Sequence, residues 1–172
     1  MKPPILSLTN RPSYAHAGVD TTRTPRPGEQ MGKDYHFVTR DEFRQLVDQQ
    51  AFLEWAEFSR NLYGTSIKAV QSVLQAGQRC ILDIDLQGVN SVKKAGAHLD
   101  PFYIFIRPPS LAVLRTRLQE RNTESAESLG LRLQAAEADT RFAEENPGFY
   151  NVVIVNDDVD RAYQQLESAI FD

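Results

Sequence analysis

The sequence of 172 residues contains one cysteine and one tryptophan, and its acidic residues outnumber its basic residues. The single cysteine, Cys80, excludes an internal disulfide and is typical of a protein that works in a reducing compartment. The formal net charge of −4 argues against a surface that coats nucleic acid, because such surfaces are basic. We therefore expect a cytoplasmic protein that has no nucleic-acid partner.

Long apolar runs are also absent from the sequence. No stretch reaches the roughly 20 apolar residues that a membrane-spanning helix needs. The opening residues, MKPPILSL, are too short and too soon followed by polar residues to form a signal peptide. The three histidines show no metal-ligand spacing, so we expect no metal centre built from side chains alone. We expect a monomer with no membrane partner.

Two patterns of apolar residues divide the rest of the chain, whose length fits one domain. Over residues 67–172, short apolar runs alternate with segments of helical spacing, which is typical of a parallel sheet covered by helices on both faces. Residues 20–66 form a mixed, partly antiparallel insertion into this α/β core. The core strands are expected in RCILDID, PFYIFIRP and NVVIVND, and its later helices over 86–96, 110–121, 126–145 and 159–170.

The insertion has its own local signals. Thr39 and Glu42 form a capping box before apolar residues at helical spacing. Residues 52–58 alternate as a half-buried strand, one side of which holds Phe52, Glu54, Ala56 and Phe58. NLYG is expected to turn, and the next helix is expected to be capped by Thr65 and ended by Gly77.

Arginines occur in two places where they could hold a phosphate group. The stretch TTRTPRPGE, residues 21–29 and here called the arginine loop, holds Arg23 and Arg26. Its prolines restrict the preceding residues to extended conformations, and Gly28 favours a turn, so the loop is pre-shaped. Planar guanidinium forks suit phosphate. Arg117 and Arg121, four apart on one helical face, could close on a second phosphate. Solvated basic surfaces are the alternative for both pairs.

Polar residues follow two of the expected core strands. Asp83 and Asp85 stand two apart after RCIL, and Asn156 and Asp157 follow NVVIV. In open α/β sheets, ligands bind beyond the carboxyl ends of the strands. The two aspartates would share one face of a strand and could point at one magnesium ion or one ligand. Capping of the following helix is the alternative.

Taken together, these segments resemble the guanylate kinases in order and approximate spacing. The resemblance is carried by TTRTPRPGE, FLEWAEFSRNLYGTS, ILDIDLQGV, RPPS, RNTESAES and VIVNDDVDRAY, and it runs from about Asp20 to Asp172. It implies the α/β fold of P-loop nucleoside-monophosphate kinases, with a GMP-binding region at about 20–66 and a helical lid at about 110–135. It also implies phosphorylation of GMP to GDP by ATP and Mg²⁺.

The resemblance further implies a role for each matching residue. The GMP-binding residues would be Arg23, Arg26, Glu29, Tyr35, Glu54, Tyr63, Thr65, Asp83 and Asp85. Among them, Glu54 and Thr65 would read the guanine edge, and the two aspartates would face the nucleotide and magnesium. The catalytic arginines would be Arg26, Arg121 and Arg132. The ATP-binding residues would be Arg117, Asn156 and Asp157.

One element that such a kinase uses is not found in the sequence. A phosphate loop reads G-x-x-x-x-G-K-[ST] between a strand and a helix. The nearest string, GEQMGKD at 28–34, has three residues between its glycines and Asp34 in place of Ser or Thr. Residues 1–18 therefore form an atypical N-terminal segment, in which Ile5–Leu8 could imitate the first strand, before a kinase-like domain at 19–172.

Three interpretations stay open. The chain could be a GMP kinase that has lost its true amino terminus, a non-catalytic GMP- or protein-binding module, or a weakly active enzyme with a different ATP contact. The lid arginines and Asn156–Asp157 are surplus to a binding module, which favours the first interpretation. In each case we expect GMP binding to be retained, and ATP binding and phosphoryl transfer to be weakened.

Overall fold

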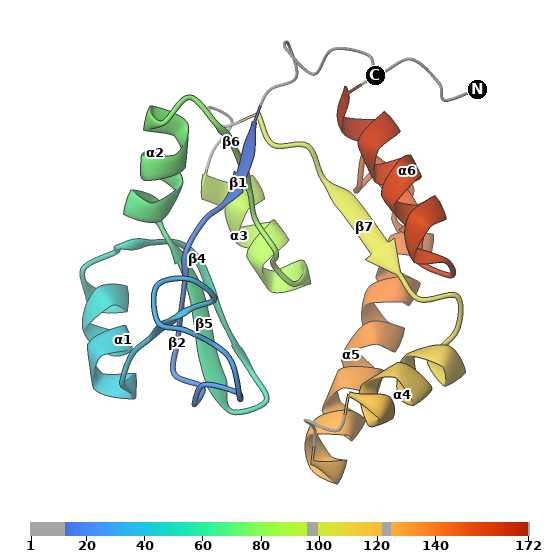
Figure 1. Ribbon diagram of the computed structural model, residues 1–172, viewed down its shortest axis with the longest axis horizontal. Helices are drawn as coiled ribbons and strands as arrows, with labels where there is room; N and C mark the ends of the chain where they lie inside the picture. Colours follow the sequence, from blue (N-terminus) through green and yellow to red (C-terminus); the bar gives the residue numbers. More distant parts are fainter. Residues whose placement is uncertain (1–12, 96–99, 122–124, 172) are drawn as a thin grey trace. The chain divides into compact units, whose positions relative to one another are not determined.

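The structure, a computed structural model, describes residues 13–95, 100–121 and 125–171 (Figure 1). The chain divides into two compact units, Met1–Ala97 and His98–Asp172. Each unit combines helices with strands, and both parallel and antiparallel pairing occur. The expected α/β class is confirmed.

A short parallel pair of strands lies in the first unit. Strand β1 (Tyr14–His16) pairs with β6 (Arg79–Ile81), and the Ala17 N–H extends the pairing by donating to the Ile81 carbonyl at 3.1 Å. The sequence placed a possible first strand at Ile5–Leu8, which lies outside the described residues. The strand that pairs with β6 instead begins at Tyr14, so part of the segment expected to be atypical belongs to the sheet.

A mixed sheet follows, with the strand order β3–β2–β5–β4. Its β2–β3 pair is parallel, and β5 pairs antiparallel with both β2 and β4, which confirms the expected mixed insertion. The sequence predicted a turn at NLYG, but these four residues lie in β5. The chain reverses at Ser59 and Arg60, both with positive φ. The strands are β2 (Val19–Thr21), β3 (His36–Phe37), β4 (Phe52–Phe58) and β5 (Asn61–Ser66).

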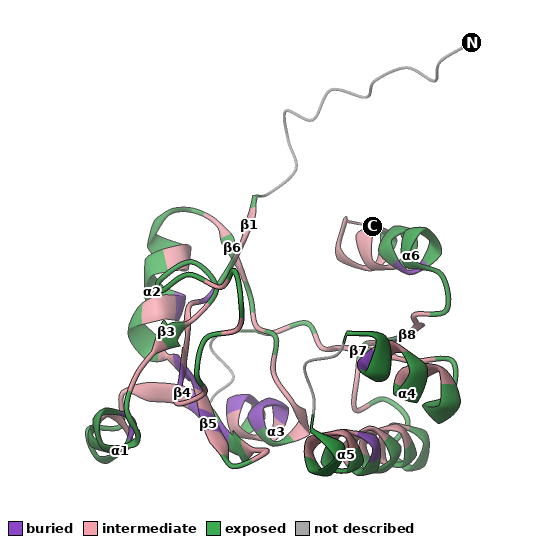
Figure 2. Ribbon diagram, turned by 60° about the horizontal axis from the view of Figure 1, so that its bottom comes forward, coloured by how far each residue is buried: buried purple, intermediate pink, exposed green. Residues whose placement is uncertain are grey.

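Helices α1 (Arg40–Asp48) and α3 (Leu86–Ala95) lie on opposite sides of this sheet (Figures 1 and 2). The capping box at the start of α1 is confirmed, since Thr39 and Glu42 each accept from the other's backbone N–H. Helix α2 (Ile67–Gln75) is capped by Ser66 and not by Thr65. Thr65 is still part of β5, and its N–H donates to the Glu54 carboxylate.

The α1 side of the sheet is held by aromatic packing. Phe43 is fully buried and stacks on Phe52 at 4.5 Å between ring centroids, with Trp55 edge-on at 6.3 Å. The register of β4 shifts between Phe52 and Glu54. This irregularity turns Phe52 toward α1, so the expectation that Phe52 shares a face with Glu54 was wrong.

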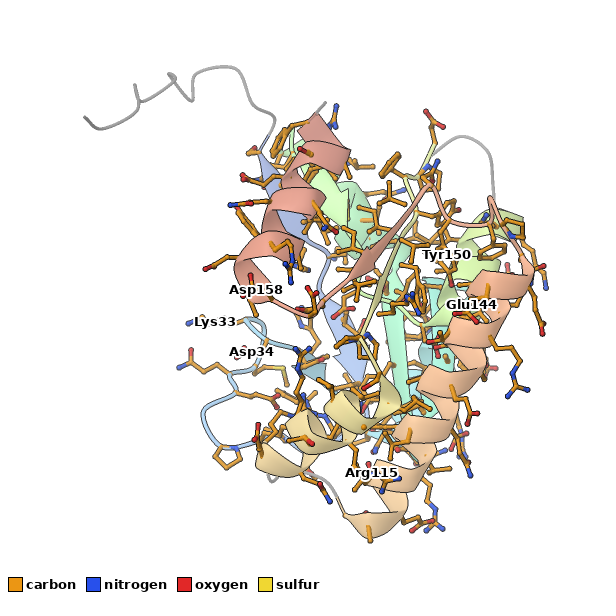
Figure 3. The ribbon with its side chains drawn as sticks, turned by 90° about the vertical axis from the view of Figure 1, so that its right-hand side faces the viewer. Lys33, Asp34, Arg115, Glu144, Tyr150 and Asp158 are labelled. Atoms are coloured by element: carbon orange, nitrogen blue, oxygen red, sulfur yellow. The ribbon has the colours of Figure 1, made fainter. Side chains whose placement is uncertain are left out.

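The second unit is built on the parallel pair β7 (Ile104–Arg107) and β8 (Val152–Val155). Its helices match the expected ranges closely: α4 (Leu111–Glu120), α5 (Ala126–Glu145) and α6 (Val159–Phe171). Ile154 of β8 is 1% exposed. Tyr150, labelled in Figure 3, stacks on Phe105 at 5.0 Å. None of the helices in the described residues is both long enough and apolar enough to cross a membrane.

Gly64 supplies a test of the packing between β5 and α1. A Cβ atom there would lie 2.9 Å from the Phe52 ring and 3.0 Å from Phe43. Gly64→Ala should therefore lower the free energy of unfolding by about 1–3 kcal/mol, the usual cost of overpacking. Gly130 of α5 has open space around it. Gly130→Ala should raise the free energy of unfolding by about 0.5–1 kcal/mol. Urea denaturation followed by circular dichroism measures both, and equal signs would contradict the packing argument.

Candidate functional site

The arginine loop is anchored at its start and closed by its own carboxylate. Thr21 and Thr22 join it to Leu62 of β5: Thr21 Oγ1 donates to the Leu62 carbonyl at 3.0 Å, and Thr22 Oγ1 accepts from the Leu62 N–H at 2.9 Å. Glu29 accepts from the Arg23 guanidinium at 2.9 Å and, through its other oxygen, from the Arg26 N–H at 2.7 Å. The loop is therefore pre-shaped, as the sequence predicted.

Aromatic rings surround the Arg23 guanidinium. Its central carbon lies 5.1 Å from the Tyr35 ring centroid and 5.9 Å from that of Phe37. Tyr63 meets Tyr35 edge-on at 6.5 Å. Hydrogen bonding from Arg23 lowers the pKa of the Glu29 carboxyl. The structure thus gathers Arg23, Glu29, Tyr35 and Tyr63, four of the residues predicted to bind GMP, and presents a cation beside two phenol groups.

A buried carboxylate lies on the adjoining strands of the same sheet. Glu54 is 6% exposed, and one of its oxygens accepts from the Thr65 N–H at 2.9 Å. Thr65 is fully buried. Within the described residues its hydroxyl oxygen makes no hydrogen bond of good geometry, although it lies close enough to the Glu54 carboxyl to lower the pKa of that group. Tyr63 stands two residues before Thr65 and so shares its face of β5. The Glu54 carboxylate can accept hydrogen bonds from the polar edge of a ligand, and the Thr65 hydroxyl can donate one to it.

Helix α3 covers the Glu54 side of the sheet. Its glycine, Gly88, comes so close that an added Cβ atom would lie 2.9 Å from a Glu54 carboxylate oxygen. Asp85 caps this helix by accepting from the Gly88 N–H at 2.9 Å. Asp83 is exposed. Because β6 ends at Ile81, the two aspartates lie in the loop after the strand, and the expected shared strand face is not formed.

The surroundings of Glu54 favour its neutral form. Burial raises the pKa of the Glu54 carboxyl above its ordinary value of 4.5, hydrogen bonding from Thr65 lowers it by less, and the charge of Asp85 raises it further. A buried carboxylate is costly unless it is paired. The site therefore holds an acceptor that a ligand with two adjacent N–H donors would stabilise.

The second unit brings the predicted ATP-binding residues together. The Arg117 guanidinium donates to the Asn156 carbonyl at 2.8 Å and to the Asp157 carbonyl at 3.2 Å. The Arg117 side chain therefore holds the turn between β8 and α6 by binding the backbone carbonyls of that turn. The Asp157 carboxylate pairs with Arg161 at 2.7 Å, and this hydrogen-bonded ion pair lowers the pKa of the Asp157 carboxyl.

Comparison with known proteins decides the family of this chain. The family model described as guanylate kinase matches residues 8–172. This chain belongs to the guanylate kinase family. It is 52% identical to the guanylate kinase of Sus scrofa over 150 residues, which cover 87% of this chain and 74% of the relative. It is 49% identical to the guanylate kinase of Homo sapiens over 170 residues, covering 95% and 85%.

A solved structure supports the same family at the level of the fold. The crystal structure of guanylate kinase from Anaplasma phagocytophilum is 31% identical, with a TM-score of 0.69 over 92% of this chain and 77% of that one. The family resemblance inferred from the sequence motifs is confirmed. The roles of individual residues stay predictions.

The remaining residues predicted from the guanylate kinase resemblance lie on the helices of the second unit. Arg121 is the C-cap of α4 and is exposed, and Arg132 is half-buried on α5. Arg115, labelled in Figure 3, lies in the middle of α4. The predicted lid at 110–135 thus corresponds to α4 and the first half of α5.

Gly88 and Arg161 support predicted site residues of this guanylate kinase family member, and neither was identified from the sequence. Gly88 gives Glu54 its room beside α3, and the glycine of LQGV three residues after Asp85 was the available signal. Arg161 pairs with Asp157, and their i, i+4 spacing was the signal. Gly88 shapes a predicted site by its packing, and Arg161 shapes another by its charge.

Glu54→Gln should make the protein more stable near neutral pH. A carboxyl whose pKa is raised by folding stabilises the fold below its ordinary pKa of 4.5, and this contribution is lost as the pH rises through the raised pKa. Glutamine stays neutral and keeps an oxygen for the Thr65 N–H. Urea denaturation should show the gain near neutral pH, and no gain below pH 4.5.

Glu57, which is exposed on the same strand and pairs with Arg40 at 3.4 Å, provides the control for this change. Glu57→Gln should alter the stability little at either pH. A Glu54→Gln protein that is less stable than the parent near neutral pH would show that the ionised carboxylate supports the fold.

Proposed function

We propose that this chain binds GMP, with the phosphate held at the arginine loop and the guanine edge held by Glu54 and Thr65. The observation that carries the proposal is the buried Glu54 carboxylate, which lies across from a fully buried Thr65 whose hydroxyl makes no hydrogen bond of good geometry within the described residues. Arg23, Tyr35 and Tyr63 gather in the same unit and supply donors that suit a phosphate.

The chemistry of the guanine edge supports this choice of ligand. Guanine presents a ring N–H and an exocyclic amino group side by side, and a carboxylate accepts from both. Adenine has no N–H at the corresponding ring position, so it would leave the buried carboxylate with the Thr65 N–H but without a donor from the ring. A site built on hydrogen bonds rejects the analogue that lacks them strongly, because its own polar groups stay unpaired.

We further propose that this chain holds the residues that serve the phosphorylation of GMP to GDP by ATP, apart from the phosphate loop. Arg26, Arg121 and Arg132 would stabilise the charge on the transferring phosphoryl group, the main protein contribution in this chemistry. The turn that Arg117 holds, with Asn156 and Asp157, would bind ATP. Asp83 and Asp85 would face the bound nucleotide.

Magnesium would neutralise charge on the phosphates of a bound nucleotide. Among the described residues, no three His, Cys, Asp or Glu side chains gather into a metal site, and Asp85 is already used as a helix cap. These residues therefore do not fit a magnesium ion held by the protein alone.

A cytoplasmic location and a monomeric state complete the proposal. Cys80 is a free, partly buried thiol, which suits a reducing compartment. The chain is acidic overall, with a formal net charge of −4, and is not expected to bind nucleic acid.

The first test is a calorimetric titration with GMP and with AMP. The chain should bind GMP in preference to AMP. Arg26→Ala should weaken GMP binding by about 1.5–3 kcal/mol, roughly ten- to a hundredfold, because it removes a charge-assisted hydrogen bond to phosphate. Arg44→Ala, which removes an exposed arginine of α1, is the control and should leave binding unchanged. Equal affinity for the two nucleotides, or none for either, would refute the proposal.

The second test separates the guanine contact from the phosphate contact. Glu54→Gln replaces one acceptor oxygen by a donor, so it should weaken GMP binding and reduce the preference over AMP. Its effect on AMP binding should be small, because adenine does not use the carboxylate. Unchanged selectivity in the same titrations would leave Glu54 with a structural role only.

The third test concerns phosphoryl transfer by these 172 residues. We expect turnover near background, because the sequence shows no phosphate loop, and losing a single preorganised donor can cost about 10²–10³ in rate. A version with a family-type strand, phosphate loop and helix placed before Tyr14 should be active in a coupled ADP-release assay. The same version with the loop lysine replaced by alanine is the control. Activity of the short chain within about tenfold of the extended one would show that ATP binds elsewhere.

A further inference from the structure

The turn that joins the arginine loop to β3 contains the only methionine besides Met1. Met31 forms a bridge with Tyr35, and the Gly32 N–H donates to the Tyr35 carbonyl at 2.9 Å. The Asp34 carboxylate closes the turn from outside by accepting from the Gln30 N–H at 2.8 Å. Lys33 and Asp34 mark this turn in Figure 3.

The Met31 sulfur serves as a hydrogen-bond acceptor for the edge of the sheet. The Phe37 N–H donates to it at 3.3 Å. Within the described residues, β3 pairs with β2 alone, and the Val38 N–H donates to the Thr21 carbonyl on that side. Alternate backbone groups point to opposite edges of a strand, so the Phe37 N–H points away from β2 and toward the sulfur.

The residues that contact Met31 also contact Arg23. Tyr35 forms the bridge with Met31, Phe37 donates to its sulfur, and the ring centroids of the two lie 5.1 and 5.9 Å from the central carbon of the Arg23 guanidinium. Their own rings lie 5.8 Å apart. A change that separates Met31 from Phe37 would release a backbone contact next to two rings that lie against the Arg23 guanidinium.

We propose that Met31 is an oxidation site through which peroxides weaken the binding of the GMP phosphate; the effect on GMP rests on the function proposed above. The side chain is 62% exposed, so a peroxide can reach it. The thioether sulfur gives two electrons to hydrogen peroxide: the O–O bond breaks, one oxygen joins the sulfur as a sulfoxide, and the other leaves as water.

The geometry explains why oxidation would be felt at the arginine loop. A sulfur 3.3 Å from the Phe37 nitrogen leaves no room for an oxygen atom between them. A sulfoxide oxygen needs about 2.9 Å to the nitrogen for a hydrogen bond, in addition to its bond to sulfur, so the turn must open or the contact must break. Either outcome removes the hydrogen bond at the backbone of Phe37, whose ring centroid lies 5.9 Å from the central carbon of the Arg23 guanidinium.

The competing thiol is less exposed to this chemistry. Cys80 lies partly buried in β6, and burial raises the pKa of its thiol, which lowers the fraction of the reactive thiolate. Cys80 lies in the β1–β6 pair, whereas Met31 lies in the turn before β3. Replacing either residue therefore separates the two sulfurs in an experiment.

The test treats the full chain with hydrogen peroxide and locates added oxygen by peptide mass. Met31 should gain one oxygen, GMP binding should weaken about two- to tenfold, as expected for the loss of a neutral hydrogen bond, and methionine sulfoxide reductases should restore it. Met31→Leu should lose no GMP affinity on treatment. Cys80→Ser should respond like the parent.

Hydrogen exchange at the Phe37 amide tests the same inference without GMP. This amide should exchange faster after oxidation, and Met31→Leu should show fast exchange from the start. Complete oxidation of Met31 with unchanged Phe37 exchange would overturn the proposal, as would an equal loss of GMP affinity in treated Met31→Leu. A parent protein that binds no GMP before treatment would refute the proposed function, while the exchange measurement would still decide the role of Met31.

Discussion

The antiparallel pairing of β4 with β5 is the interaction on which the candidate site depends. It places Glu54 opposite Thr65 and Ala56 opposite Tyr63, so residues eleven and seven positions apart in sequence share one face. The same pairing places Gly64 and Trp55 on the other face, where Phe43 of α1 packs. A slip of one residue would exchange the two faces and put the carboxylate into the aromatic core. The aromatic packing under α1 therefore fixes the position of the polar group under α3.

Much of this arrangement could be predicted from the sequence, because it depends on local signals. The capping box at Thr39 and Glu42, the stiff arginine loop and the helices of the second unit follow from short-range rules and from the spacing of apolar residues. The motifs predicted the family, because several separate segments occur in the same order and at about the same spacing as in guanylate kinases. Of the residues that the family resemblance assigned to the GMP phosphate, Tyr35 lies beside Arg23 and Tyr63 lies beside Tyr35.

The errors arise where pairing between distant segments overrides the local signal. NLYG reads as a turn, but Leu62 is bonded to both Thr21 and Thr22, and this holds the segment in a strand. The reversal falls instead on Ser59 and Arg60, where the sequence has no glycine. Phe52 leaves the face of Glu54 because of a register shift, which alternation alone does not encode. Asp85 caps α3 because β6 ends early, and the length of β6 is set by its partner β1.

Strand β4 also determines what the protein's one tryptophan can report. Trp55 follows Glu54 directly, yet its indole faces α1 and lies 6.3 Å from the Phe43 ring, on the side of the sheet away from Glu54. A ligand bound at Glu54 would have the sheet between itself and the indole, so it could not quench the emission by stacking. Light emitted by this residue instead measures how tightly α1 rests on the sheet. The emission of Trp55 would therefore report the packing of α1 on the sheet and not contact with a ligand at Glu54.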